Sequence, residues 1–210
     1  MKAAPAATIW SDPVPWKQLS AEAEVLPREF YARPTVEVAR DLLGKVIMHG
    51  RCAGRIVEVE AYLGLEDLAA HASRGITPRT RVLFGPPGHA YVYFIYGMHE
   101  CLNLVAEPEG TPGCVLIRAL EPLCGVAEMR VRRPAARRLR DLASGPGKLT
   151  AAIGITRRHN GADVTKGSLT VRRLARGPRP EIEVSPRVGI RHCADWPLRF
   201  YIKGNPFVSR

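Results

Sequence analysis

The sequence has no long run of apolar residues. Uninterrupted stretches such as residues 92–95 are short, whereas a helix that crosses a bilayer needs about 20 apolar residues. The N-terminal segment MKAAPAATIWSDPVPW also lacks the continuous apolar core of a signal peptide. We therefore expect a soluble, cytoplasmic protein, associated with the nucleoid if the source is bacterial, and no membrane partner.

Cysteine is scarce and lacks metal-binding spacing. The five cysteines are an odd number and include no C-x-x-C pair, so neither a disulfide framework nor a zinc knuckle is indicated. His99 with Cys101, or His192 with Cys193, would be half a metal site, but no second ligand cluster lies at a suitable spacing. We predict reduced thiols, no metal and no cofactor.

Acidic residues are few, and their deficit is confined to the second half of the chain. The formal net charge is +11; residues 1–120 hold 12 basic and 13 acidic residues, whereas residues 121–210 hold 19 and 7. Six arginines fall within residues 130–140, RVRRPAARRLR, where they could contact phosphates and release counterions. This half of the chain is typical of a polyanion-binding surface, although a solvated charged helix or loop has the same composition.

Secondary-structure signals predict one α+β domain. Residues 1–22 are rich in alanine and proline without periodicity and are expected to be a flexible tail, with the domain over residues 23–210. Helix signals begin at Thr35, a plausible N-cap, end before Gly44, and return over 127–143 and 148–153. Alternating patterns predict strands over 45–49, 55–62, 90–96, 101–106, 114–120, 168–174, 181–184 and 198–203.

The strand predicted over 55–62 has two carboxylates on one face. The period of two places Ile56, Glu58, Glu60 and Tyr62 together and directs the intervening apolar residues to the core. Alternate residues are about 6.6 Å apart at a rise of roughly 3.3 Å each, a spacing reminiscent of paired glycosidase carboxylates. Many surface strands share this pattern, so spacing alone leaves catalysis and a solvated face both open.

Three tyrosines occur within six residues of the segment HAYVYFIYGMHECLN. Tyr91 and Tyr93 share one face of a strand, whereas Tyr96 points to the other face and precedes Gly97, where the chain can turn. An aromatic side chain at a hairpin tip of a basic protein is a candidate wedge between stacked bases. Ordinary packing is the alternative, because strands are rich in tyrosine.

A glycine-rich segment, SGPGKLTAA, departs from the phosphate-binding P-loop. Leu142 stands where that motif needs its first glycine, and Leu149 replaces its serine or threonine. What remains is a Gly-Pro-Gly turn that opens a helix, whose free N–H groups could hold a backbone phosphate. A plain helix start explains the segment equally well.

These segments occur in the order found in the alkyladenine (3-methyladenine) DNA glycosylase family. The chain resembles that family over about residues 25–208, most closely in ARDLLGK, RIVEVEAYLGLEDLAAHASRG, TPRTRVLFGPPGHAYVYFIYGMHECLN, VLIRALEP, SGPGKLTAAIGI and PLRFYIKGNPFVS. The resemblance implies a single α+β domain with a curved, mostly antiparallel sheet, flanking helices and a protruding, DNA-inserting β-hairpin. It also implies a monomeric enzyme that acts on double-stranded DNA containing damaged purines.

The resemblance assigns a role to each motif. Glu60 of the E-A-Y motif matches the residue that activates water, and Arg118 matches the arginine that helps to hold this water; Glu58 is the neighbouring competitor. The remaining matches are the pocket walls Tyr62, His71 and Tyr93, the guanine-excluding Asn103, the intercalating Tyr96 and the adjacent Met98. His99 and Glu100 depart from relatives that have bulkier apolar or aromatic residues there, which leaves the preferred lesion open.

The implied function is that of a monofunctional DNA glycosylase of base excision repair. Such an enzyme flips out an alkylated or deaminated purine, of the 3-methyladenine, 7-methylguanine, hypoxanthine and ethenoadenine class, and hydrolyses its N-glycosidic bond. Two alternatives from other classes fit parts of the sequence. A non-catalytic nucleic-acid-binding module would use the basic and aromatic residues, and a hydrolase of small glycosides would use the paired carboxylates.

Overall fold

A curved antiparallel sheet forms the centre of the protein. The computed structural model describes residues 10–174 and 179–209, and every strand pairing within them is antiparallel. The strands are β1 (Ala23–Val25), β2 (Val46–His49), β3 (Cys52–Tyr62), β4 (Ala90–Ile95), β5 (His99–Val105), β6 (Cys114–Cys124), β7 (Leu169–Leu174), β8 (Ile182–Ser185) and β9 (Arg199–Ile202). The α+β class predicted from the sequence is therefore confirmed.

Strand β3 is the hub of the sheet. The strands run β1-β7-β2-β3-β6-β5-β4, and β9, with β8 beside it, also pairs with β3. The first part of β3 pairs with β2, while Glu58 to Glu60 pair with β9. Strands β6 and β9 thus both pair with the residues of β3 that carry the two carboxylates.

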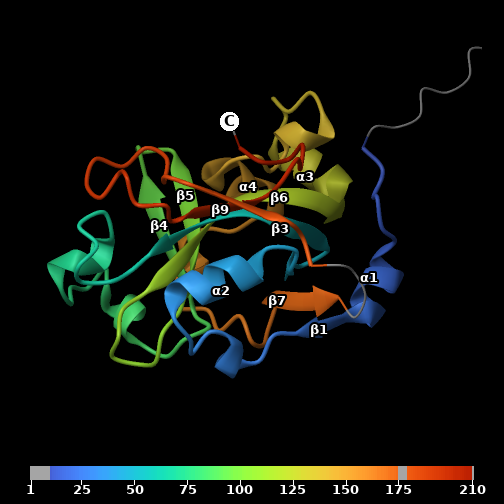
Figure 1. The fold of residues 1–210 in the computed structure, drawn as a ribbon. Coiled ribbons are helices and arrows are strands. Elements are labelled where there is room, and N and C mark those ends of the chain that lie inside the picture. The colour runs from blue at the N-terminus through green and yellow to red at the C-terminus, as the bar shows by residue number, and fades with distance from the viewer. Residues whose placement is uncertain (1–9, 175–178, 210) are drawn as a thin grey trace, which may run out of the picture.

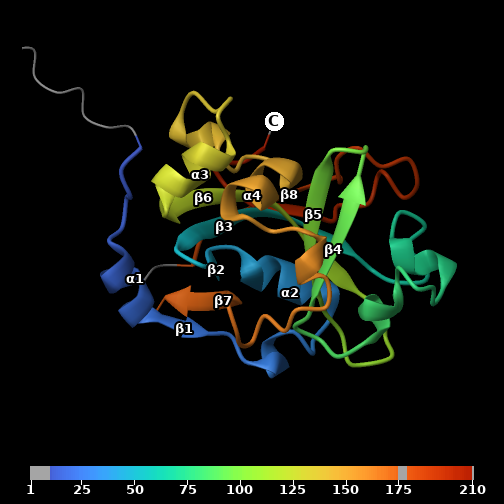
Figure 2. The same ribbon diagram turned by 180° about the vertical axis from the view of Figure 1, so that it is seen from behind.

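The helices are short and pack on this sheet. They are α1 (Trp16–Glu22), α2 (Thr35–Leu42), α3 (Val126–Arg132) and α4 (Pro146–Ile153). Helix α2 lies toward the viewer in Figure 1, and α4 comes forward when the molecule is turned in Figure 2. Apolar residues of α2 and α4, among them Leu42 and Leu149, are fully buried in one core with strand residues such as Ile117. Burying one such side chain contributes about 1.5 to 3 kcal/mol.

Three details of the helices differ from the sequence-based predictions. The unstructured tail predicted over residues 1–22 is wrong for Trp16–Glu22, which form α1 and bury Leu19; residues 1–9 lie outside the described residues. The helix predicted over 127–143 ends at Arg132, because Pro134 lacks an N–H and disfavours helix before it. Thr35 is the first helical residue rather than the cap, and its N–H and hydroxyl donate to Glu107 Oε1 at 2.6 and 2.8 Å.

A β-bulge in β3 changes which side chains share a face. The register with β6 shifts between Ile56 and Glu58 and again before Val59, and a bulge reverses the alternation beyond it. Ile56 therefore lies in the core with Val59 and Ala61, which corrects the prediction that it shares the face of the carboxylates. Both faces of β3 are buried there, and Glu58 and Glu60 are 0% exposed.

The turn between β4 and β5 projects at one end of the molecule. Figures 1 and 2 both place this turn at the same end as residues 133–140, drawn in yellow to gold, and opposite the short helix η1 (Arg28–Phe30). This is the arrangement expected of a protruding hairpin near a basic segment. Among the described residues, no helix has both the length and the apolar character that a bilayer crossing demands.

Candidate active site

A cavity of about 270 Å³ opens beside the β4–β5 hairpin. Its walls come from segments far apart in the sequence: the end of β3, residues 69–72, the hairpin, β6, the start of α4 and residues 188–190. The lining side chains are mainly aromatic and apolar and include Tyr62, His71, Tyr91, Tyr93, Tyr96, Cys101, Asn103, Cys114, Leu116 and Arg118. A concave, largely apolar space with a few polar groups is typical of a small-molecule or base-binding site.

One wall is a cluster of three rings. The rings of His71 and Tyr93 have centroids 4.6 Å apart, those of Tyr91 and Tyr93 are 5.3 Å apart, and His71 Nδ1 lies 2.9 Å from the Tyr91 hydroxyl. Burial, followed by the charges of Arg79 and Arg74, lowers the pKa of His71 to about 4. His71 is therefore a neutral imidazole near pH 7, and it presents a polar edge within an otherwise aromatic surface.

Asn103, which pairs with Tyr91 across the hairpin, has a fixed orientation in the cavity. Its Nδ2 donates to the Tyr91 carbonyl oxygen at 3.2 Å, and its Oδ1 accepts a weak bond from the Cys114 thiol at 3.9 Å. Asn103 is 3% exposed, so its amide has little freedom to rotate away from a bound group. Burial raises the pKa of Cys114 to about 12, which keeps the thiol protonated and able to donate.

Glu60 lies directly behind the cavity wall. Its Oε1 accepts from the Val188 N–H at 2.7 Å and pairs with Arg118 Nη1 at 3.2 Å, and its Oε2 accepts from the Tyr62 hydroxyl at 3.0 Å. All three partners line the cavity, whereas Glu60 itself is 0% exposed. Burial, then the Glu60 carboxylate, raise the pKa of Tyr62, so this hydroxyl remains a donor at neutral pH.

Glu58 lies on the same side of β3 but is held by other parts of the chain. Its Oε1 accepts from Arg118 Nε, Arg199 Nε and Ser209 Oγ at 2.8 to 2.9 Å, and its Oε2 accepts from the Ser209 N–H at 2.6 Å. Burial alone would raise the pKa of Glu58, but Arg118, Ser209 and Arg199 together lower it. Glu58 is thus an ionised anchor for Arg118 and for the C-terminal segment.

The partners of the two carboxylates differ in where they lie. An ionised carboxylate oxygen offers about two lone-pair sites, and Oε2 has a single donor in both Glu58 and Glu60. All three partners of Glu60 line the cavity, whereas Arg199 and Ser209, which hold Glu58, do not. A water molecule that reaches Oε2 of Glu60 would therefore come from the cavity, although in this structure the protein partners cover this carboxylate.

The hairpin tip places Tyr96 at the mouth of the cavity. Tyr96 adopts φ 55°, a left-handed conformation that is uncommon for a bulky residue, and its side chain is 76% exposed while still lining the cavity. Met98 is 69% exposed on the same turn but is not among the lining residues. His99 also lines the cavity, and a Cβ at Gly147 would lie 2.7 Å from its ring, so only glycine permits this approach of α4 to the hairpin.

The arginine-rich segment is folded onto itself. Arg130 donates to the Pro134 carbonyl oxygen, Arg132 pairs with Glu128 at 3.0 Å, and Arg138 pairs with Asp141 at 3.1 Å. Helix α3 ends at Arg132, so beyond it only the loop form of the solvated alternative remains. Internal partners occupy part of the charge predicted to contact phosphates, while Arg137 and Arg138 remain exposed.

The structure brings most of the predicted site residues together. Glu60 and Arg118 form one ion pair, and the predicted pocket residues line one cavity with Tyr96 at its edge. The sequence analysis missed Val188 as a donor to Glu60, as well as Arg199 and Ser209 on Glu58. A backbone N–H has no signature in the sequence, and Arg199 and Ser209 were visible only as parts of the motif PLRFYIKGNPFVS. The described residues contain no group of three or more histidine, cysteine or acidic side chains arranged to hold a metal.

Most of the chain is similar to known proteins. Residues 29–206 match the family described as methylpurine-DNA glycosylase (MPG). A protein from Methanocella arvoryzae is 54% identical over 195 residues, covering 89% of this chain and 96% of its own length; one from Koribacter versatilis is 50% identical over 196 residues, covering 90% and 95%. A third, from Methanoculleus marisnigri, is 55% identical over 191 residues, covering 88% and 98%. All three are assigned as 3-methyladenine DNA glycosylases. The chain therefore belongs to the methylpurine-DNA glycosylase family, enzymes of DNA repair that hydrolyse the N-glycosidic bond of damaged bases.

Proposed function

We propose that the protein is a monofunctional DNA glycosylase that flips an alkylated or deaminated purine into the cavity described above. Its substrates belong to the 3-methyladenine, 7-methylguanine, hypoxanthine and ethenoadenine class, and it acts on double-stranded DNA as a monomer. One observation carries the proposal: a carboxylate with unfilled hydrogen-bond capacity adjoins an aromatic cavity whose mouth is bordered by an exposed tyrosine.

In this proposal Glu60 is the general base and Arg118 holds the attacking water. The water oxygen bonds to C1′ of the deoxyribose, the N-glycosidic bond breaks with its electron pair leaving on the purine, and the water proton passes to Glu60. The carboxylate also stabilises the positive charge that develops on the sugar. Glu60 is covered here by Tyr62, Arg118 and Val188. The step therefore requires a small shift of this wall that admits a water molecule to the second acceptor site on Oε2, while the Tyr62 hydroxyl keeps the carboxylate in place.

The ring cluster recognises the flipped base. A purine stacked on Tyr62 or Tyr93 gains about 1 to 3 kcal/mol, and a positively charged alkylated purine is attracted further to the rings. The neutral His71 supplies a hydrogen-bonding edge. Asn103 is fixed by Tyr91 and Cys114, so it excludes the exocyclic amino group of guanine by steric contact.

Tyr96 is the wedge that fills the space left in the duplex, with Met98 beside it. Unstacking and unpairing a nucleotide cost a few kcal/mol, and an inserted side chain offsets part of that cost. The exposure of both side chains at the projecting hairpin supports this role. The nearby residues 133–140 provide phosphate contacts through arginines that remain exposed.

The reaction uses water and no covalent enzyme intermediate. The described residues that line the cavity include no lysine, so the proposal contains no Schiff base and no strand cleavage. Borohydride treatment during turnover should therefore trap no adduct between protein and DNA. A trapped adduct would assign the chemistry to an amine nucleophile.

The decisive experiment compares Glu60→Gln with Glu58→Gln in single-turnover excision of hypoxanthine from a duplex. Glu60→Gln should lose activity by orders of magnitude and retain DNA binding. Loss in Glu58→Gln alone would move the base to Glu58, and binding without base release by the wild type would favour the non-catalytic module. Equal activity on a free nucleoside and on duplex DNA would favour the hydrolase of small glycosides.

A further inference from the structure

A buried ion pair lies behind the cavity. Arg187 and Asp67 have side chains that are both 0% exposed, and they form two parallel bonds, one of them from Nη2 to Oδ1 at 2.8 Å. Neither residue lines the cavity. Removing two charges from water costs free energy that their attraction often does not offset. Stability alone therefore does not explain a buried pair in this position.

Asp67 fastens the segment that follows β3. Its two carboxylate oxygens accept from the backbone N–H groups of Leu63 and Ala69, each at 3.1 Å. These bonds fold residues 63–70 into a compact loop that leads directly to His71, a residue of the ring wall. Asp67 therefore fixes one side of the cavity.

Arg187 holds a second segment of the cavity wall against β3. Its Nη1 donates to the Ala61 carbonyl oxygen at 3.0 Å, and its guanidinium lies over the Tyr62 ring with the central carbon 4.7 Å from the ring centroid. The next residue, Val188, donates its N–H to Glu60 Oε1. One side chain thus holds the loop at 188–190 against the strand that carries both Glu60 and Tyr62.

We propose that Arg187 and Asp67 are positioning residues for Glu60. The pair sets the distance between the loop at 188–190 and β3, and thereby the bond from Val188 to Glu60 and the place of the Tyr62 ring. A planar guanidinium with five donors in a fixed geometry suits this task, because it bonds Asp67 and the backbone at the same time. A lysine supplies the charge without that geometry. The inference rests on the proposed function, since it assigns a way in which Glu60 is held.

The first test is Arg187→Lys, measured by thermal unfolding, by affinity for a hypoxanthine-containing duplex and by the single-turnover rate at saturating enzyme. The expected result is a rate about 10- to 100-fold lower with a dissociation constant within about threefold of wild type, since small misplacement of a catalytic group mainly slows chemistry. Arg28→Lys is the matched control. Arg28 lies in η1, at the end of the molecule opposite the hairpin turn (Figures 1 and 2), and pairs with Asp163 at 2.6 Å. This variant should keep the wild-type rate even where its melting temperature falls.

The second test distinguishes positioning from general damage. In the Glu60→Gln background, Arg187→Lys should cause little further loss of rate, because residues that act through one group are strongly non-additive. A full additional loss in the double variant would show a defect unrelated to Glu60 and would overturn the proposal, as would a wild-type rate in the folded single variant.

If Arg187→Lys does not fold, Asp67→Asn, which keeps one acceptor oxygen, is assayed in the same way, and an unchanged rate overturns the proposal. If the proposed function itself is wrong, the results differ from these. The wild type then releases no base, or the single variant Glu60→Gln retains full activity.

Discussion

Glu60 and Tyr62 are two residues apart on β3, and the Tyr62 hydroxyl donates to Glu60 Oε2 at 3.0 Å. Tyr62 therefore contributes both a ring to the cavity and a hydrogen bond to the Glu60 carboxylate behind it. These two contributions can be separated by mutation, because phenylalanine keeps the ring and removes only the hydroxyl.

Tyr62→Phe should lower the single-turnover rate about 10- to 100-fold, because a hydrogen bond to a charged group contributes about 1.5 to 3 kcal/mol. Affinity for lesion-containing DNA should change little, since the stacking surface is retained. Rates and dissociation constants measured on the same duplex provide the check. A large loss of affinity at an unchanged rate would show that the hydroxyl contacts the substrate instead.

Protonation of His71 should oppose folding in mild acid. Burial and two nearby arginines lower its pKa in the folded protein to about 4, below the value of about 6.5 in an unfolded chain. The unfolded state therefore binds more protons in this window, and stability falls as pH decreases from about 6.5 toward 4, by up to about 1 kcal/mol per pH unit. His71→Gln should flatten this part of the curve of unfolding free energy against pH. Equal slopes in the two proteins would contradict the depressed pKa.

Replacing Tyr96 should weaken the flipped state without altering the fold. The side chain is 76% exposed, so Tyr96→Ser should leave the melting temperature within a few degrees of wild type. It removes the group that we propose fills the vacancy in the duplex, so fluorescence of a flipped reporter base should fall several-fold. Phe94→Ser is a suitable comparison, because Phe94 is 39% exposed on the same hairpin and is not among the cavity residues. Unchanged reporter fluorescence in Tyr96→Ser would remove the wedge assignment.

Arg79 should influence selectivity by the charge of the lesion. Its guanidinium lies 5.2 Å from the centroid of the Tyr93 ring. Under the proposed function this charge should oppose a cationic purine and stabilise negative charge on a neutral purine as it leaves. Arg79→Gln should raise the ratio of kcat/KM for 7-methylguanine to that for hypoxanthine about three- to tenfold, the size of a screened interaction of about 1 kcal/mol.

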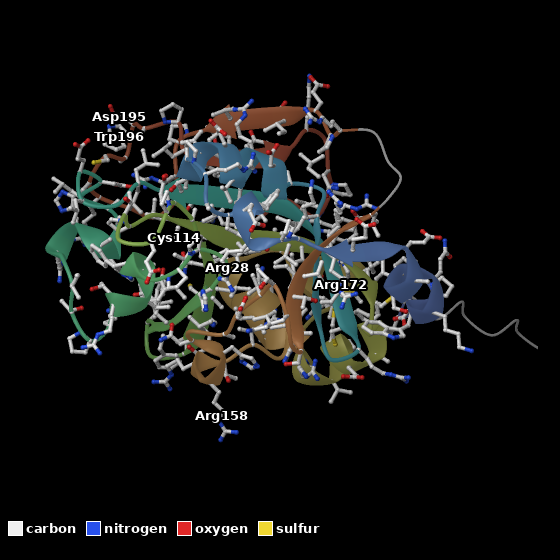
Figure 3. All side chains as sticks on the ribbon, turned by 90° about the horizontal axis from the view of Figure 1, so that it is seen from below. Arg28, Cys114, Arg158, Arg172, Asp195 and Trp196 are labelled. Carbon is white, nitrogen blue, oxygen red and sulfur yellow. The ribbon has the colours of Figure 1, made fainter. Side chains whose placement is uncertain are left out.

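Arg158→Gln provides the control for Arg79→Gln. Arg158 projects away from the body of the protein (Figure 3), and this variant removes the same charge from an exposed position. The ratio between the two lesions should therefore stay at the wild-type value. A parallel fall for both lesions in Arg79→Gln would indicate a phosphate contact instead of an effect on the base.

The sequence by itself determined the class of fold, the family and eight of the nine strands among the described residues, all but β1. Local patterns were sufficient for these, because alternation and turn residues act within a few positions, and the motifs around Glu60, Tyr93 and Arg118 are contiguous. Local patterns were less reliable where distant segments intervene. The N-terminal helix α1 buries Leu19 against core residues that are far away in the sequence, and the bulge in β3 arises from pairing with β6.

Only the tertiary structure decided which donors reach each of the two carboxylates. Glu58 and Glu60 have the same chemistry and similar sequence neighbours, and both are fully buried. They differ because Arg199 and Ser209 arrive from the C-terminal part of the chain to hold Glu58 away from the cavity, whereas Val188, a residue of the cavity wall, contributes one backbone N–H to Glu60. Hydrogen-bond capacity depends on which donors converge in space, and that convergence is a property of the folded chain.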